Sequence, residues 1–380
     1  MAVARDADRR RRSRLRNLLA PSVVVVALAA CGGSSKPAAS SSSSAPPTTT
    51  ATSAPSTTAA VTGQRGLSAV VSAIVGNGKD DGKGIPGPAT DASLGDKVHY
   101  AVASNGDIFM IVGSVDVLKV SGGQVTKFGL LDPSAQGFGG IAVASDGTVF
   151  VATTSTVVKF DANGTRSDVL DAKTAGLSTG LGPIALDSAG NVYVADGLRR
   201  VTRVAPDGQT SLIAGTGVQA KPDTAEGDGG PATASPLGAP AQLAVDSVGN
   251  LYIADTSALR VRRVTPDGTI TTIAGGGTTV LNASGAFAPD GTKPTDLKLS
   301  QVTGVAVDSK GRVYVADAGM DAIFRFGTTG GIEFLMGDQK GGSESDGLPA
   351  NATRLTNASD LEIDAQKNLV FLEARVIYRI

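Results

Sequence analysis

Four polar side chains stand out because each occupies a position that holds a small residue in other copies of a repeated sequence unit. One repeated position is alanine in five copies and Glu362 in the sixth. Two residues earlier, the rows contain His99, Gln242 and Asp360, where the other copies have glycine or proline. Two carboxylates beside an imidazole suit a hydrated cation, a sugar or an amine. The alternative is that water solvates these side chains and no ligand binds.

The four residues belong to one sequence unit that is repeated along the chain. Its clearest copies begin at Ile184, at Leu243 ("LAVDSVGNLYIADTSALRVRRVTPDGTITTIAGGG") and at Val305, and weaker copies begin at Tyr100 and Ile141. Each copy contains four short apolar runs, which are separated by glycine-containing turns. A recurring four-stranded unit of about 40 residues predicts a blade of a β-propeller.

A sixth copy begins at Leu361 and stops after its third strand, at Ile380. The missing fourth strand is predicted at the other end of the domain, because residues 67–78, "LSAVVSAIVGNG", align with "GTITTIAGGG" of the fourth copy. An apolar edge strand without a partner promotes aggregation, so this segment is expected to cover residues 376–380. The sequence therefore predicts an all-β fold, a six-bladed β-propeller closed by an N-terminal strand.

Four of the six junctions between copies carry long inserts, and two are short. The inserts all join a fourth strand to a first strand, so they are expected on one face of the disc, as a groove with loop walls. Each insert ends in a leucine at the same distance from the next first strand: Leu94, Leu237, Leu299 and Leu355. Ring closure places His99 beside Asp360 and Glu362 on this face.

A basic residue occupies the third place of every third strand: Lys119, Lys159, Arg203, Arg263, Arg325 and Arg379. One interpretation of this basic belt is an anion-binding ring. The interpretation we favour is that the long side chains cover apolar surface and pair with nearby carboxylates. Aspartates that end first or second strands, such as Asp246 and Asp255, are expected to accept hydrogen bonds within the blade.

The N-terminal residues predict export. Seven arginines and two aspartates give residues 1–31 a charge of +5, which leaves −6 for the rest of a chain whose net charge is −1. An acidic body does not attract phosphate backbones, so no nucleic-acid partner is expected. The basic start precedes "LLAPSVVVVALAAC", which is too short for a stable membrane-spanning helix and is typical of a signal peptide over residues 1–30.

The end of this stretch, "LAAC", resembles the bacterial lipobox, and Cys31 is the only cysteine in the chain. The resemblance implies cleavage before Cys31 and acylation of this residue, which anchors a protein to a membrane surface. The alternative is an ordinary signal peptide with an incidental cysteine. Residues 31–63 are rich in Ser, Thr and Pro and predict a disordered stalk, which leaves residues 64–380 for the propeller.

The repeat rows "AVDSxGNLYIAD" and "RVRRVxPDGTITTIAG", with the insert "GDGGPATASPL", resemble the bacterial NHL-repeat β-propellers, including the extracellular sensor propellers of bacterial receptor kinases. The resemblance covers residues 67–380 and implies six blades with strand-exchange closure. The Asn-His-Leu that names the family is absent, since the corresponding stretch, residues 256–260, reads "TSALR". Similar propellers include lyases that depend on several histidines, whereas this chain has only His99.

These features predict a monomeric binding or scaffolding lipoprotein on the outer side of the cell membrane. Its expected partners are the membrane, through the lipid, and an envelope polysaccharide, a peptide or an exported protein. The alternative is a propeller hydrolase or lyase with a carboxylate-bound metal in the central channel. The sequence contains no Ser-His-Asp elbow, phosphate loop or dinucleotide motif. We expect no cofactor, with calcium as the one ion that the carboxylates would suit, and the identity of any metal stays open.

The substitution Cys31→Ser should release the protein from the membrane, because no other segment of the sequence is predicted to hold it there. In a detergent-partitioning assay, we expect the wild-type protein in the detergent phase and the variant in the aqueous phase. A variant that stays in the membrane fraction would contradict the predicted anchor.

Overall fold

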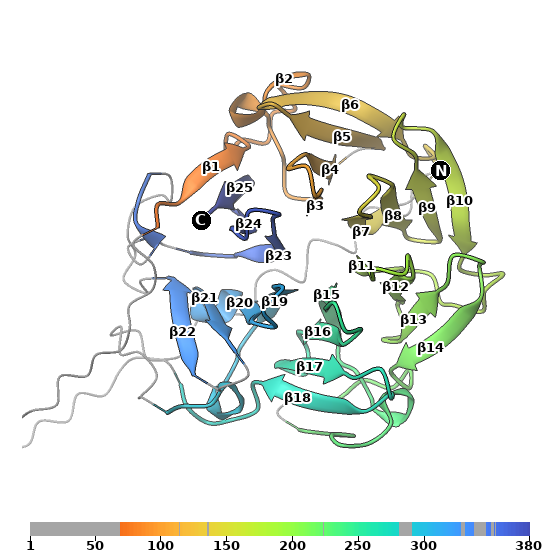
Figure 1. Cartoon of the computed structure of the whole chain (residues 1–380), viewed down its shortest axis with the longest axis vertical. Coiled ribbons are helices and arrows are strands. Elements are labelled where there is room, and N and C mark those ends of the chain that lie inside the picture. The colour runs from red at the N-terminus through yellow and green to blue at the C-terminus, as the bar shows by residue number, and fades with distance from the viewer. Residues whose placement is uncertain are drawn as a thin grey trace, which may run out of the picture. The chain divides into compact units, whose positions relative to one another are not determined.

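The computed structural model describes residues 69–113, 115–134, 137–222, 224–280, 291–327, 331–337, 347–350, 353 and 355–380. In these residues, six antiparallel β-sheets are arranged as blades around a central axis (Figure 1), as the repeats predict. The helices of the described part are short 3-10 turns, and none of them is long and apolar enough to cross a membrane. The predicted signal peptide, Cys31 and the stalk lie outside the described residues.

Each blade has four main strands, and the first of them lies next to the axis. Blade 1 contains β3 (Val98–Val102), β4 (Ile108–Val112), β5 (Asp116–Ser121) and β6 (Gln124–Leu130), with β2 (Gly87–Pro88) outside β6. Blade 2 contains β7 (Phe138–Val143), β8 (Val149–Thr153), β9 (Thr156–Phe160) and β10 (Arg166–Asp171). Blade 3 contains β11 (Ile184–Leu186), β12 (Val192–Ala195), β13 (Val201–Val204) and β14 (Thr210–Ala214).

Blades 4 to 6 follow the same order. Blade 4 contains β15 (Pro240–Val245), β16 (Leu251–Asp255), β17 (Arg260–Val264) and β18 (Ile270–Ala274). Blade 5 contains β19 (Val302–Val307), β20 (Val313–Asp317), β21 (Ala322–Phe326) and β22 (Ile332–Met336). Blade 6 contains β23 (Ser359–Ile363), β24 (Leu369–Glu373), β25 (Val376–Arg379) and β1 (Ser72–Val75). The 3-10 helices are η1 (Ala89–Asp91), η2 (Ala232–Ala234), η3 (Pro294–Asp296) and η4 (Ala318–Met320).

The ring is closed by β1, which forms the outer strand of blade 6. It pairs antiparallel with β25, Ser72 opposite Arg379, and completes the sheet order β1-β25-β24-β23. The predicted strand exchange is therefore confirmed. Val71 packs in the core between blades 5 and 6 and Val75 in the core between blades 6 and 1, and both are fully buried. The closing strand thus supports the apolar cores on both sides of its blade.

A glycine follows the fourth strand because the chain passes close to a backbone carbonyl there. A Cβ on Gly76 would lie 2.5 Å from the carbonyl oxygen of Arg375, and one on Gly275 would lie 2.4 Å from that of Leu259. Both glycines have positive φ, which side chains disfavour. Because Gly76 and Gly275 are equivalent in this way, the alignment of the N-terminal strand with a fourth strand is correct.

An aspartate fixes the turn after the first strand. Asp246 accepts hydrogen bonds from the backbone N–H of Val248 at 3.1 Å and of Asn250 at 2.8 Å, and from the Tyr252 hydroxyl at 2.9 Å. Equivalent bonds to turn amides recur at Asp187, Asp308 and Asp364. These aspartates therefore have the structural role that the sequence predicts.

A second carboxylate, at the end of the second strand, anchors the start of the same blade. Asp255 is buried and accepts hydrogen bonds from the backbone N–H of Gly238 at 2.9 Å and of Ala239 at 2.8 Å. Asp317 and Glu373 accept the equivalent backbone bonds in blades 5 and 6. In blades 4 to 6, this carboxylate thereby fixes the point at which the chain enters the first strand.

The described parts of the inserts run to the rim of the propeller. The leucines that end the inserts are all buried, so their common re-entry into the blades is confirmed. Ahead of these leucines, short segments pair with the outer strand of the following blade: β2 with β6, Pro231 with Thr269 and Pro349 with Val70. In the described part of the chain, these segments reinforce blade edges, and the cleft at the channel mouth is lined near the inserts by residues that follow the leucines.

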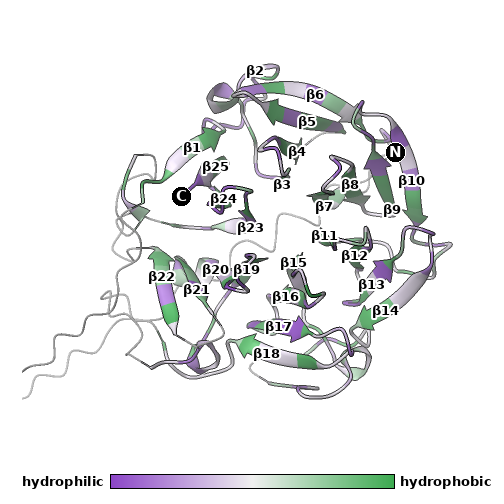
Figure 2. Cartoon of the chain, viewed as in Figure 1, coloured by the Kyte–Doolittle hydropathy of each residue, from purple (hydrophilic) through white to green (hydrophobic). Residues whose placement is uncertain are grey.

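The apolar cores lie between neighbouring blades, where the faces of two sheets meet. Between blades 6 and 1, for example, Val370 and Ile377 pack with Val98 and Met110. Figure 2 shows the hydrophobic colour recurring along the strands around the ring. Three members of the basic belt form the expected ion pairs: Lys119 with Asp107, Arg325 with Glu333 and Arg379 with Asp364.

A chain that begins at residue 80 lacks β1 and should leave the edge of β25 exposed. Burial of the two valines contributes about 3–6 kcal/mol, so we expect a melting temperature lower by roughly 10 °C or more, with aggregation. A chain that begins at residue 64 should melt like the full chain. Equal melting temperatures of the two shortened chains in calorimetry would contradict this role of β1.

Candidate functional site

The inner strands line a narrow channel along the axis, with a cavity of about 180 Å³. Five alanines contribute small side chains to it: Ala101, Ala142, Ala185, Ala244 and Ala306. Glu362 on β23 lies among them and is the one ionisable residue of the lining in the described part of the chain. The structure therefore places Glu362 in the ring of small residues, as its row in the sequence indicates.

The environment of Glu362 keeps its carboxyl neutral at pH 7. Burial, together with the negative charge of Asp360, raises the pKa of Glu362 from 4.5 to about 8. A neutral carboxyl both donates and accepts hydrogen bonds. The channel thus contains an acid that exchanges its proton close to neutral pH.

His99 and Asp360 face each other across the seam between blades 1 and 6. His99 Nδ1 lies 3.5 Å from Asp360 Oδ2, and the imidazole also contacts the edge of Phe138, with ring centroids 6.1 Å apart. Burial lowers the pKa of His99, but the hydrogen bond and the charge of Asp360 outweigh it, so the pKa is raised above 6.5 overall. Closure thus places an imidazole of raised pKa against a carboxyl group at the channel mouth.

Asp360 has an unusual backbone conformation. Its φ is 47°, and no other non-glycine residue of the inner strands has positive φ in the described part of the chain. In blade 4 the β-bulge lies before Gln242, whereas in blade 6 it lies between Ser359 and Glu362 and includes Asp360. The hydroxyl of Tyr100 donates to the carbonyl oxygen of Asp360 at 2.5 Å. A strained residue that a neighbouring blade holds in place is typical of a functional site.

The amide of Gln242 is occupied by backbone groups. Its Nε2 donates to the carbonyl oxygen of Leu361 at 2.8 Å, and its Oε1 accepts from the N–H of Leu361 and of Val305, both at 2.9 Å. Gln242 is buried and lies outside the lining of the mouth. The structure therefore brings His99, Asp360 and Glu362 together, while Gln242 ties blade 4 to blades 5 and 6.

A cleft of about 690 Å³ opens at the mouth above His99 and Asp360. Its charged residues also include Lys97, Asp96 and Arg375, and Arg375 Nε lies 2.6 Å from Asp96 Oδ1. This second ion pair again joins blade 6 to the segment that enters blade 1. The remaining lining is mostly small or neutral and polar, with the ring of Phe138 as an apolar surface.

Two charged residues of the mouth, Asp96 and Arg375, are not marked by any pattern in the sequence. Asp96 follows the first insert, and Arg375 lies in the turn between β24 and β25 at φ 66°. Glu362 stands out because it replaces the alanine found at the equivalent position of the other copies. Asp96 and Arg375 do not replace a repeated residue in this way. Their pairing depends on the contact between the first and last blades.

In the residues that the structure describes, no group of three or more His, Cys, Asp or Glu side chains is placed to hold a metal ion. The arrangement instead offers paired charges, a neutral acid and an aromatic edge, which suit a polar organic ligand.

Residues 181–265 match the model of the teneurin NHL domain. The chain is similar to a solved protein of unknown function from Bacteroides thetaiotaomicron, with 21% identity over 81% of this chain and 74% of that chain and a TM-score of 0.61. Two auxiliary nutrient binding proteins are also similar. The one from Bacteroides thetaiotaomicron has 11% identity over 81% and 75% of the chains and a TM-score of 0.59. The one from Bacteroides ovatus has 12% identity over 82% and 76% and a TM-score of 0.58. At these identities the likeness concerns the fold alone.

The raised pKa of Glu362 makes the stability of the protein depend on pH. The folded protein keeps a proton that the unfolded chain loses above about pH 4.5, so Glu362 makes the free energy of unfolding fall as the pH rises to about 8. Glu362→Gln cannot ionise. We expect both proteins to melt together at about pH 5 and the variant to melt a few degrees higher at about pH 8.5.

Thermal melts of the two proteins over this pH range test the prediction. The contribution of His99 is common to both proteins and cancels in the difference between their melting temperatures. A difference that is the same at every pH would show that Glu362 does not titrate in this range.

Proposed function

We propose that the chain is a lipid-anchored extracytoplasmic β-propeller of the NHL-repeat type that binds a saccharide of the cell envelope at the channel mouth. One observation carries the proposal: the cleft of about 690 Å³ with His99, Asp360, Asp96 and Arg375 in its lining. This volume lies in the range of small-ligand sites, about 300–1,000 Å³. Two of the similar propellers are described as nutrient binding proteins, which supports a binding role.

The chemistry of the lining favours a hydroxyl-rich ligand over a strongly charged one. The cleft presents both signs of charge in two ion pairs, so neither an anion nor a cation is favoured overall. Thr154, Thr303 and Asn357 add neutral polar groups, and Phe138 adds an apolar surface. Hydroxyl groups of a sugar can both donate and accept hydrogen bonds, so they suit the carboxylates and the guanidinium at once.

The location of the protein at the membrane rests on the sequence. The lipobox-like "LAAC", with Cys31 as the acylated residue, supports an anchor, and residues 31–63 support a stalk. Such a stalk would hold the propeller away from the membrane surface, within the surrounding envelope. The protein acts in this proposal as a monomer, because one chain provides the whole cleft.

The binding prediction concerns the two ion pairs of the mouth. In the full chain, Asp360→Asn combined with Arg375→Gln should weaken the retention of the protein on purified envelope polysaccharide at least about tenfold, because hydrogen bonds to charged groups are lost. Asparagine tolerates positive φ, so Asp360→Asn should preserve the bulge. The matched control is Asp168→Asn with Arg166→Gln, an ion pair on the outer strand β10, which should leave retention unchanged.

The same assay separates the alternatives. Equal retention of the wild type and the mouth variant, with equal melting temperatures, would contradict binding at the mouth. Release of soluble fragments from the envelope material by the wild type would instead favour a hydrolase or lyase.

A further inference from the structure

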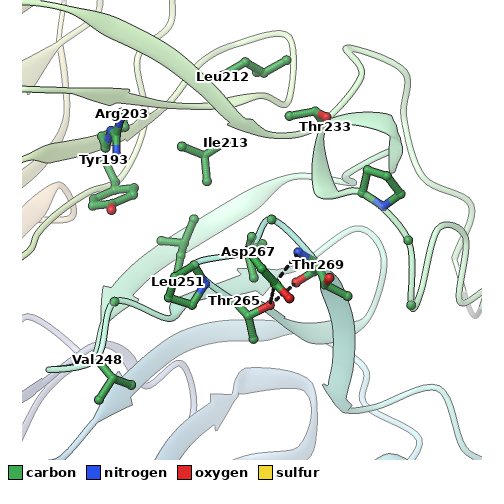
Figure 3. A pocket seen from close by; sticks show the side chains of 17 residues that line it. Tyr193, Arg203, Leu212, Ile213, Thr233, Val248, Leu251, Thr265, Asp267 and Thr269 are labelled. Atoms are coloured by element: carbon green, nitrogen blue, oxygen red, sulfur yellow. Dashed lines mark hydrogen bonds between the residues drawn. The ribbon is translucent and has the colours of Figure 1, made fainter.

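A second hollow lies at the rim of the propeller, between β14 of blade 3 and the turns of blade 4. It has a volume of about 520 Å³ (Figure 3). Figure 3 shows Ile213 between the two walls, with Val248 and Leu251 below it and Arg203 beside Tyr193 at one end. Leu212 and Val248, which also line this rim groove, are 43% and 71% exposed. The groove thus combines exposed apolar side chains with one cationic residue, Arg203, and one carboxylate, Asp267, whose Oδ1 accepts hydrogen bonds from Thr265 and Thr269.

The outer edge of β14 has no strand beside it in the described part of the chain. The outer strands of blades 1, 4 and 6 are covered by segments of the preceding inserts. The junction before blade 3 is short, so no such segment reaches β14. In the described part of the chain, the edges of β10 in blade 2 and of β22 in blade 5 also have no strand beside them, but β10 carries Arg166, Asp168 and Asp171 and β22 carries Glu333, and such charges protect an edge. β14 carries no charged residue and no proline, so its edge is open to strand addition.

Arg203 is the member of the basic belt that lines this groove. In blade 5, Arg325 lies opposite Glu333 on the neighbouring strand and pairs with it at 2.8 Å. In blade 3 the residue opposite Arg203 is Ser211. The Nε of Arg203 and the Oγ of Ser211 are buried and have no hydrogen-bond partner. A buried donor without a partner is costly, so a carboxylate brought by a ligand would be stabilised here.

We propose that the rim groove binds an extended acidic peptide of a partner protein. The peptide backbone adds to the free edge of β14. One acidic side chain of the peptide pairs with Arg203, and an apolar side chain packs on Ile213, Val248 and Leu251. The edge supplies affinity through backbone hydrogen bonds, and the guanidinium and the apolar wall supply selectivity.

This site is distinct from the channel mouth. The rim groove is lined by the turn after β15, with Val248, and by the turn after β17, with Asp267. The mouth is lined by the turn after β24, with Arg375, and by the segments that enter first strands. Successive strands of an antiparallel blade alternate in direction, so these two sets of turns lie on opposite faces of the disc. The propeller can therefore hold a ligand at its mouth and a partner at its rim at the same time.

The test is a selection of short random peptides displayed on phage against the full chain purified in detergent, followed by affinity measurements on the enriched peptides. We expect enrichment of sequences with an Asp or Glu next to β-branched or aromatic residues and without proline. Arg203→Met should remove the preference for acidic residues and lower the affinity for the enriched peptides at least about tenfold. The matched control is Arg263→Met, because Arg263 occupies the same place in blade 4, has the same unpartnered Nε and lies outside the groove.

Peptides with a proline and the protein variants test separate parts of the proposal. A proline at the centre of an enriched peptide should abolish its binding, because the backbone hydrogen bonds of the added strand are lost. Any one of four results would overturn the proposal. These are equal peptide affinities for the wild type and Arg203→Met, equal losses of affinity in Arg203→Met and Arg263→Met, unchanged binding of the proline-containing peptide, and the absence of any enrichment. Asp360→Asn with Arg375→Gln should leave peptide binding unchanged, which separates this site from the one at the mouth.

Discussion

The structure depends on one set of backbone hydrogen bonds, the pairing of β1 with β25. An open arc of blades would leave the apolar edge of the last sheet in water, and the N-terminal strand removes that edge. Because the first insert leads from β1 into blade 1, closure also fixes the last blade against the first. Both ion pairs of the candidate site, His99 with Asp360 and Arg375 with Asp96, cross this seam. The candidate site is thus a consequence of how the ring closes.

Residues that recur from blade to blade stabilise the fold, whereas residues that depart from the repeat form the candidate sites. In blades 4 and 5, the aspartates that end the first and second strands bind turn and entry amides, which fixes both ends of the first strand. The candidate sites lie where the same plan is broken. Glu362 stands where the other blades have alanine, and Asp360 lies within the β-bulge of β23. Arg203 has no carboxylate opposite it, whereas Arg325 pairs with Glu333. A rigid repeated scaffold can tolerate such local costs because its many other bonds are satisfied.

The electrostatics of the channel follow from its narrow bore. An ionised carboxylate among alanine and branched apolar side chains loses most of its hydration, and the charge of Asp360 disfavours a second anion. Glu362 therefore holds its proton, while Asp360, nearer the mouth, faces His99. The two carboxyl groups are close in sequence but differ in surroundings, because one lies inside the ring of small residues and the other has an imidazole beside it. The mouth can thereby present charge without an unpaired charge deep in the channel.

Much of this organisation follows from the sequence alone. Several features can be recognised by aligning the repeats with one another. They are the repeated strands, the missing fourth strand of the sixth copy, the common re-entry of the inserts and the position of Glu362 among alanines. The amide of Gln242 was not predictable, because it is taken up by Leu361, which lies 119 residues away. The positive φ of Asp360, the Asp96–Arg375 pair and the uncovered edge of β14 likewise depend on the contacts between segments distant in the chain. The sequence determines what each blade is, since blades form through near neighbours, whereas the seam, the bulge and the rim groove are decided by tertiary packing, because only the closed ring brings their residues together.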